Sequence, residues 1–517
     1  MKIISFNLIL FTLLLAFSCK EEKKPTPFEI LISQQTDFDV LIHRGQVVDG
    51  SGATAFAADI LLKGDSIAFV GQVDTAKITF SKYIDAKGKT VSPGFIDTHA
   101  HGNPLKTPDF ENFLAMGVTT ISLGQDGFSP SYPNIEEWFN KIEDKGIRPN
   151  LAMFIGHGTL RQLSGINFNP DPSEEELEKM GNILEKALQA GCLGMTTGLE
   201  YTPGTYGKKE ELVHLAKIVG KHDKMIMSHM RNEDDEAMEN SISELLEQGK
   251  YCHVHVSHMK VVYGKGEERA HEILGILENA RKEGIEVTAD VYPYNASYTG
   301  IGIVFPDWAK GPNNYANVKI TKKDELAAYL RQRVTKRNGP EATLLGTAPW
   351  TGKTLAQVAK ESGKPFEEVL IDDIGPGGAS GAYFVMNETL QETFVKDSLV
   401  MICSDGSPTG HHPRGHGTFA KVIEEYVFQK QLFSLEEAIR KMTSLSAESM
   451  GLTDRGRIEV GKKADILIFE PEKVQAKATY ENPYQLAEGF DWVLINGDIK
   501  RENGQLVGER NGVILKR

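Results

Sequence analysis

The chain has 517 residues, of which 40% are hydrophobic and 25% are charged, and its formal net charge at pH 7 is -14. This length predicts one large domain with a smaller satellite, and the composition is typical of a globular protein rather than a disordered or collagen-like one. The acidic balance and the lack of a basic run argue against nucleic acid as a partner.

Residues 1–19 have the pattern of a bacterial export signal. Their apolar run, from Ile3 to Phe17, is shorter than the roughly 20 residues that a membrane-spanning helix needs. The run ends in Leu15-Ala16-Phe17-Ser18-Cys19, which resembles a lipobox, the motif whose cysteine becomes acylated. We therefore expect a lipoprotein of the cell envelope, anchored to the membrane through Cys19 and facing the periplasm or the cell surface. A plain secretory signal or a short anchor helix is the alternative, and residues 20–37 would form a polar tether.

Both ends of the remaining chain have the pattern of short antiparallel strands. Residues 38–92 alternate apolar segments with Gly and Asp turns, and residues 455–517 repeat this pattern. We expect the two segments to form one small β-sandwich domain.

Between these segments, residues 93–454 alternate apolar strands with helix-like stretches, which predicts parallel pairing. Eight candidate strands end near His99, Asp126, His157, Glu200, His229, His258, Asp290 and Asp405. The sequence thus predicts an α/β fold, a (β/α)8 TIM-type barrel. The gap between the last two strands is too long for one strand-helix unit, so we expect an insertion at about residues 296–350.

The sharpest chemical signal is the strand Pro-Gly-Phe-Ile-Asp-Thr-His-Ala-His, which ends in His99 and His101. Alternate side chains of a strand share a face, so both imidazoles point the same way and can hold a divalent metal ion. Other predicted strands end in His229, His258 and Asp405. Any one of these histidines alone could be a core residue, but their coincidence at the strand ends of a barrel predicts a metal site.

These residues resemble a known family. The Pro93 to His101 strand, the stretch Gly456 to Asp465 and the order of strand-terminal His, His and Asp resemble the amidohydrolase superfamily, from about residue 38 to the end of the chain. Four further motifs resemble its N-acyl-D-amino-acid deacylase branch: Gly156 to Arg161, Thr197 to Gly204, Ser257 to Lys260 and His412 to Arg414.

The resemblance implies one or two divalent ions, zinc being the expected metal. His99, His101 and Asp405 would serve one ion, and His229 with His258 the other. In many relatives a cysteine after the second strand also binds metal, whereas this chain has Asp126 there. Carboxylate oxygen is a harder ligand than thiolate and also suits other divalent ions, so the identity of the metal stays open.

The expected chemistry is hydrolysis of an amide. A divalent ion lowers the pKa of water and polarises a carbonyl group. Asp405 is the expected general base, with a purely structural ligand as the alternative role. The resemblance makes Arg414 and Lys260, with Tyr292 beside them, the clamp for the substrate carboxylate, because guanidinium binds carboxylate by two parallel hydrogen bonds. His157 and Tyr201 would line the pocket, and the role of Glu200 stays open.

The expected function is metal-dependent hydrolysis of N-acyl-D-amino acids, which are small-molecule substrates, to a carboxylate and a D-amino acid. Two alternatives remain at this stage. One is an amidohydrolase for another linear amide, such as a D-peptide or a cell-wall fragment. The other is a non-catalytic ligand-binding lipoprotein on an inactive barrel.

Overall fold

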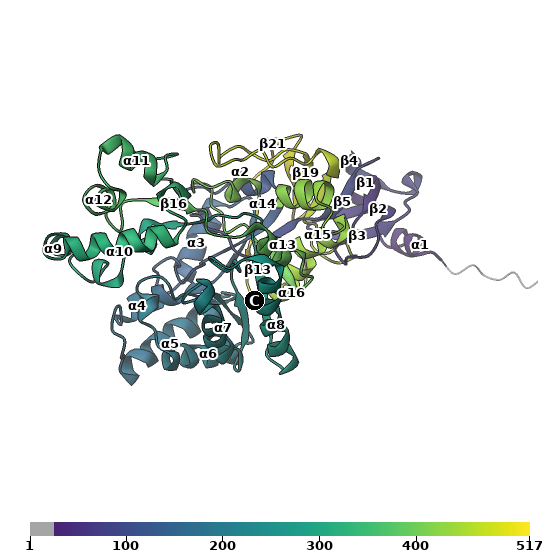
Figure 1. Cartoon of the computed structure of the whole chain (residues 1–517). Coiled ribbons are helices and arrows are strands. Elements are labelled where there is room, and N and C mark those ends of the chain that lie inside the picture. The colour runs from purple at the N-terminus through teal and green to yellow at the C-terminus, as the bar shows by residue number, and fades with distance from the viewer. Residues whose placement is uncertain (1–24) are drawn as a thin grey trace, which may run out of the picture.

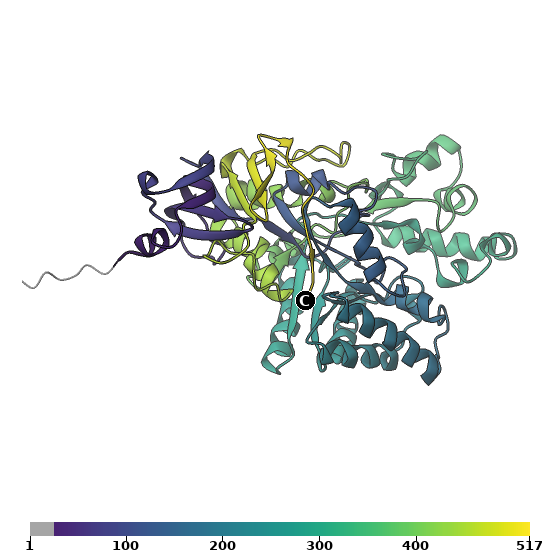
Figure 2. The same ribbon diagram turned by 180° about the vertical axis from the view of Figure 1, so that it is seen from behind.

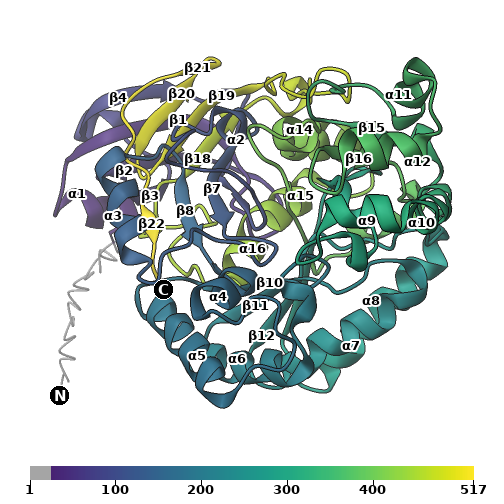
Figure 3. The same ribbon diagram turned by 90° about the vertical axis from the view of Figure 1, so that its left-hand side faces the viewer.

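The computed structural model describes residues 25–517, and a closed barrel of parallel strands lies at its centre (Figure 3). Hydrogen bonds from the backbone N–H of Asp405 to His99 O (2.8 Å) and from that of His101 to Gly406 O (2.7 Å) close the barrel between its last and first strands. The barrel strands are β6 (Phe95–Asp97), β7 (Val118–Leu123), β8 (Asn150–Met153) with its continuation β9 (Ile155–Gly156), β10 (Gly194–Gly198), β11 (Met225–His229), β12 (His253–Val256), β13 (Val287–Val291) and β17 (Val400–Ile402).

Amphipathic helices cover the outside of the barrel. In α5 (Glu174–Gln189), for example, Ser173 and Glu176 form a capping box, and Met180, Leu184 and Leu188 are buried on the inner face. The other helices of this layer are α2 (Glu111–Ala115), α3 (Glu136–Lys145), α4 (His157–Ser164), α6 (Lys209–Lys221), α7 (Met238–Gly249), α8 (Gly266–Lys282), α13 (Glu388–Lys396), α14 (Arg414–Lys421), α15 (Leu435–Met442) and α16 (Ser444–Ser449).

The two ends of the chain form one nine-stranded sheet beside the barrel (Figure 2). The N-terminal and C-terminal parts join where β5 pairs antiparallel with β18, with Val91 opposite Ile468. The predicted fold class, a barrel with a small β domain formed from both chain ends, is confirmed. The strands are β1 (Asp37–Val47), β2 (Phe56–Lys63), β3 (Ser66–Gly71), β4 (Thr79–Asp85), β5 (Thr90–Pro93), β18 (Ile466–Phe469), β19 (Phe490–Ile495), β20 (Asp498–Glu502) and β21 (Gln505–Leu506).

The final strand differs from the sequence-based expectation, which assigned all of residues 455–517 to the small domain. Strand β22 (Ile514–Leu515) pairs in parallel with β8 of the barrel, with Ile514 opposite Leu151. Leu515 is buried in a cluster with Ala152 and other barrel residues. An apolar strand pattern does not reveal which sheet edge the strand will join, so the sequence could not distinguish the two partners.

The long connection between β13 and β17 forms a separate subdomain with its own apolar core, at the opposite end of the molecule from the small sheet (Figure 1). It continues to Tyr383, beyond the predicted range of 296–350. An ion pair between Arg333 and Asp234 (2.7 Å) ties it to the barrel. Its elements are β14 (Ser297–Gly300), β15 (Thr343–Leu345), β16 (Ser380–Tyr383), α9 (Tyr315–Thr321), α10 (Lys323–Lys336), α11 (Leu355–Ser362) and α12 (Phe366–Glu368).

The segment 20–37, predicted as a tether, includes the short helix α1 (Pro27–Ile32). Its Phe28 is buried against Phe69, with ring centroids 5.4 Å apart. Cys19, the predicted site of lipidation, lies outside the described residues. Among the residues that are described, no helix has the length and apolar character needed to cross a membrane.

Candidate metal centre

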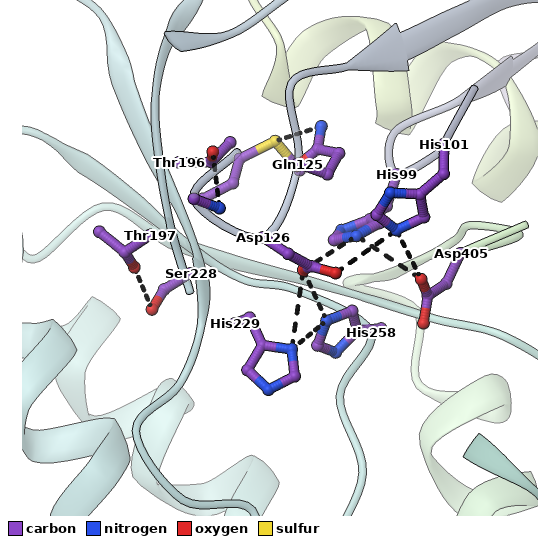
Figure 4. Close-up of polar contacts among 12 residues, drawn as sticks. His99, His101, Gln125, Asp126, Thr196, Thr197, Ser228, His229, His258 and Asp405 are labelled. Carbon is purple, nitrogen blue, oxygen red and sulfur yellow. Dashed lines mark hydrogen bonds and ion pairs between the residues drawn. The ribbon is translucent and has the colours of Figure 1, made fainter. Parts of the chain in front are cut away.

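Six side chains predicted as metal ligands meet at the carboxyl-terminal ends of the barrel strands (Figure 4). Asp126 lies at the centre of the group. Its Oδ1 is 3.1 Å from His258 Nε2 and 3.3 Å from His99 Nε2. The same oxygen is 3.6 Å from His229 Nδ1, and Oδ2 is 3.4 Å from His101 Nε2. The structure therefore brings together residues that are more than 300 positions apart in the chain, namely His99, His101, Asp126, His229, His258 and Asp405.

Asp405 approaches the group from β17 and links it to a buried cation. Its Oδ1 is 3.0 Å from His101 Nε2, and its Oδ2 is 2.6 Å from Arg414 Nη1. Burial opposes ionisation of Asp405, but Arg414 and the neighbouring imidazoles outweigh it and hold the pKa of this carboxyl well below its usual range. Asp405 is therefore ionised at neutral pH.

The local charge favours a cation among these side chains. Burial disfavours the charged form of His101, yet hydrogen bonds to Asp126 and Asp405 raise its pKa to about 10. Burial also disfavours the charged form of His229, but Glu233 and Asp126 outweigh it and raise the pKa of His229 to about 10. Positive charge is stabilised at this point whether it is carried by a proton or by a metal ion.

The backbone at three of the ligand residues is held in the left-handed region. Asp126, His258 and Asp405 have φ angles of 55°, 38° and 48°. Each residue follows the end of a barrel strand, where this conformation turns the chain sharply. Such conformations cost about 1–3 kcal/mol for non-glycine residues, and strained residues of this kind cluster at functional sites.

The donor atoms fit a divalent ion. His99, His101, Asp126 and Asp405 form one group of converging ligand atoms, and Asp126, His229 and His258 form a second, so Asp126 is common to both. Both ring nitrogens of the buried His99 lack a hydrogen bond, and His229 Nδ1 faces His258 Nε2 at 3.0 Å. Imidazole nitrogens and carboxylate oxygens are the ligands that zinc accepts. We conclude that these residues can hold one or two metal ions.

A cavity of about 760 Å³ opens over the candidate metal centre. Its wall includes three of the predicted substrate-binding residues, Tyr201, Lys260 and Arg414. Lys260 donates hydrogen bonds to Glu233 Oε1 (2.8 Å) and to His258 Nδ1 (2.7 Å). Both predicted cations are thus in the wall, and each touches a ligand residue directly: Lys260 touches His258, and Arg414 touches Asp405.

Two of the predicted substrate-binding residues, Tyr292 and His157, are not in the cavity wall, although Tyr292 lies beside Arg414 and Lys260 as expected. Tyr292 is fully buried beneath Arg414, whose Cζ is 5.0 Å from the ring centroid, and its hydroxyl donates to Met386 Sδ (3.7 Å). His157 is also fully buried, with Nε2 2.6 Å from Glu211 Oε1. Neither side chain forms part of the cavity wall. A position near a strand end indicates which end of the barrel a residue occupies, but not the direction of its side chain.

The structure adds residues that the sequence-based prediction left out. Glu233 has its Oε1 3.3 Å from His258 Nδ1 and its Oε2 3.9 Å from His229 Nε2. Asp290 accepts a hydrogen bond from the backbone N–H of His258 (2.5 Å). Glu200, whose role the sequence left open, has its Oε2 3.2 Å from His229 Nε2. Carboxylates that orient metal-binding histidines are common, and Glu233 could have been found because it follows His229 by four residues.

Comparisons with known proteins agree with this geometry. Residues 323–487 match the model of a group described as "Amidohydrolase family". An N-acyl-D-glutamate deacylase from Alcaligenes xylosoxydans xylosoxydans is 31% identical over 489 residues, which cover 90% of this chain and 93% of the relative. A D-aminoacylase from the same organism is 29% identical and covers 94% of this chain and 99% of its own length.

A solved structure is similar over the same extent. The N-acyl-D-glutamate deacylase from Bordetella bronchiseptica superposes with a TM-score of 0.81 at 28% identity, over 93% of this chain and 100% of that chain. That protein is complexed with zinc and with a phosphonate inhibitor that mimics the tetrahedral intermediate of its reaction.

Proposed function

Because the chain belongs to the amidohydrolase family and is a homologue of its N-acyl-D-amino-acid deacylases, we propose that it hydrolyses N-acyl-D-amino acids to a carboxylate and a D-amino acid. The observation that carries the proposal is the convergence of four histidines and two aspartates, all but His99 in the lining of a cavity whose wall also contains Arg414 and Lys260. This arrangement combines a metal centre with two cations that suit a substrate carboxylate.

His99, His101 and Asp405 would hold one divalent ion and His229 with His258 another, and Asp126 is within reach of both. Zinc is the metal that the Bordetella bronchiseptica relative contains. A divalent ion in such a site lowers the pKa of water and polarises the scissile carbonyl group.

Asp405 moves the proton in the proposed reaction. Its carboxylate is ionised and its Oδ1 faces the ligand cluster, so it can accept a proton from the attacking water. The same oxygen then delivers this proton to the leaving nitrogen, because an amine leaves readily only when it is protonated. Arg414 fixes the orientation of Asp405 through the 2.6 Å contact to the other oxygen.

Arg414 and Lys260 bind the α-carboxylate of the substrate. This group is attached to the same carbon as the scissile nitrogen, so it must lie next to the metal centre, where both cations are. Arg414 also donates to Tyr298 O (3.0 Å), which leaves its guanidinium in a fixed orientation at the wall. Burial opposes the charge on Lys260, but Glu233 outweighs it and raises the pKa of Lys260, so the ammonium group stays charged.

The proposed activity is tested by measuring amine release from matched N-acetyl-D- and N-acetyl-L-amino acids. Protein reconstituted with zinc, cobalt or manganese should hydrolyse the D series, and a chelator should abolish turnover. No release of amine from any N-acyl-D-amino acid with any of these metals would refute the proposal.

We also propose that the chain is exported and lipid-anchored, with its catalytic domain in the cell envelope facing the periplasm or the cell surface. The support is the apolar run Ile3 to Phe17 followed by the lipobox-like Leu15 to Cys19. In a bacterial host fed a labelled fatty acid, the wild-type protein should carry label and sediment with membranes. Cys19→Ser should lose both properties, and the control Cys252→Ser, at a partly buried free cysteine, should keep them. Unlabelled wild-type protein in the soluble fraction would contradict lipid anchoring.

A further inference from the structure

One guanidinium in the cavity wall has no counter-charge among the residues that the structure describes. Arg337 follows α10 of the insertion, is only 2% exposed and lines the cavity above the metal centre. Its Nε is buried without a hydrogen bond. Within residues 25–517, no carboxylate lies within ion-pair distance of its side chain, and its guanidinium packs on the Tyr383 ring, whose centroid is 5.0 Å from Cζ. The ring holds the guanidinium by its face and leaves the N–H groups at its edge free to donate.

The other charged groups of the wall are paired. Arg414 is 2.6 Å from Asp405, and Lys260 is 2.8 Å from Glu233. The remaining wall carboxylates also have partners: Asp126 contacts the histidines, Glu200 contacts His229, and Asp234 contacts Arg333. Buried charges in proteins are normally paired, because an isolated buried charge loses its hydration without compensation. The unpaired Arg337 therefore indicates an anion supplied by the ligand.

The position of Arg337 indicates which part of the ligand this anion is. Lys260 and Arg414 touch ligand residues and so lie beside the scissile bond. Arg337 forms no hydrogen bond or ion pair with any of the six ligand residues, all of which the structure describes, and it comes from the insertion rather than from a barrel strand. It is thus placed for a group more remote from the reacting atoms than the α-carboxylate.

On the basis of the proposed deacylase function, we infer that Arg337 binds the side-chain carboxylate of the substrate, so that the preferred substrates are N-acyl derivatives of acidic D-amino acids. A planar guanidinium matches a carboxylate by two parallel hydrogen bonds. A neutral side chain in the same place would leave Arg337 buried without a partner, so the site discriminates against it.

The test compares substrates of equal size that differ in charge. N-acetyl-D-glutamate and N-acetyl-D-glutamine are nearly isosteric, and steady-state kinetics of the metal-loaded protein gives kcat/KM for each. A hydrogen bond to a charged group corresponds to about a 10- to 150-fold change, so the wild type should prefer the glutamate derivative by this factor. Arg337→Gln should remove the preference, mainly by raising KM for N-acetyl-D-glutamate.

The matched control is Arg331→Gln within α10, the helix that Arg337 follows. Arg331 pairs with Glu367 and its side chain is 61% exposed, so this variant should keep both the preference and the wild-type rates. If the melting temperature shows that Arg337→Gln does not fold, Arg337→Met, which keeps a long side chain against Tyr383, gives the same comparison.

Each result has a distinct meaning. Equal wild-type rates with both substrates would overturn the role of Arg337 and leave the deacylase function intact. Equal losses of kcat/KM with both substrates in Arg337→Gln would also overturn this role, because Arg337 would then not distinguish a charged substrate side chain from a neutral one. Absence of turnover with every N-acyl-D-amino acid would instead refute the proposed function itself.

Discussion

Replacing Asp405 with asparagine would remove a negative charge from between Arg414 and His101 while keeping the shape of the side chain. Arg414 Nη1 is 2.6 Å from Asp405 Oδ2, and the two side chains are 6% and 7% exposed. The variant therefore leaves a buried guanidinium without its counter-charge. Removing one partner of a buried ion pair costs about 3–5 kcal/mol. Because the entropy of unfolding of a chain of roughly 500 residues is about 1 kcal/mol/K, Tm should fall by about 3–5 °C.

Calorimetry of the metal-free protein measures this loss without a contribution from metal binding. The double variant Asp405→Asn, Arg414→Met removes both charges, so it should be more stable than the sum of the two single changes predicts. In the metal-loaded protein, Asp405→Asn should also lower kcat by about 10²- to 10⁴-fold through loss of the general base. An unchanged Tm in Asp405→Asn, or strict additivity in the double variant, would refute the assignment of a coupled buried pair.

Three further changes test the metal centre and the fold. Asp126→Asn should bind less zinc per chain in elemental analysis, because Asp126 belongs to both ligand groups. Asp126→Cys should restore zinc binding, since thiolate ligates zinc. Full zinc uptake by Asp126→Asn would contradict a ligand role for Asp126. Gly198→Ala would place a Cβ 2.0 Å from Asp126 O, so the folded variant should also lose zinc, whereas Gly275→Ala, with nothing within 4 Å of its Cβ, should not. Burial lowers the pKa of Lys441 to about 7, from an ordinary value of 10.5. Between these two pH values the folded state binds fewer protons than the unfolded state, so the stability of the protein rises with pH in this range. Lys441→Met should therefore gain about 3 kcal/mol more stability at pH 6 than at pH 9.5, and an equal effect at both values in denaturant titrations would contradict a neutral Lys441.

The barrel could be predicted from the sequence because its signal is local and repeated. Each strand-helix unit places an apolar strand before a polar residue, and eight such units define the closed architecture. The pairing of β22 with β8 and the extent of the insertion as far as Tyr383 could not be predicted in this way. Both depend on which distant edge or surface an apolar segment meets, and hydrophobic periodicity does not contain that information.

The ligand cluster was predictable for the same reason. His99 and His101 share a strand face, and the parallel strands of a barrel end on the same rim, so residues at their carboxyl ends are brought to one end of the barrel. The surroundings of the cluster depend on side-chain direction instead. Tyr292 contacts Met386 and His157 contacts Glu211. Arg337 reaches the wall from an insertion whose packing the sequence does not specify.

Because β5 pairs with β18, the small sheet joins two strands that are synthesised far apart in time. Strand β5 precedes the barrel and β18 follows it, so the N-terminal strands keep an open edge until residues 466–469 have emerged from the ribosome. The barrel likewise gains β22 beside β8 only when residues 514–515 are available. The small sheet and the barrel are therefore both completed by strands that are synthesised after all the other barrel strands.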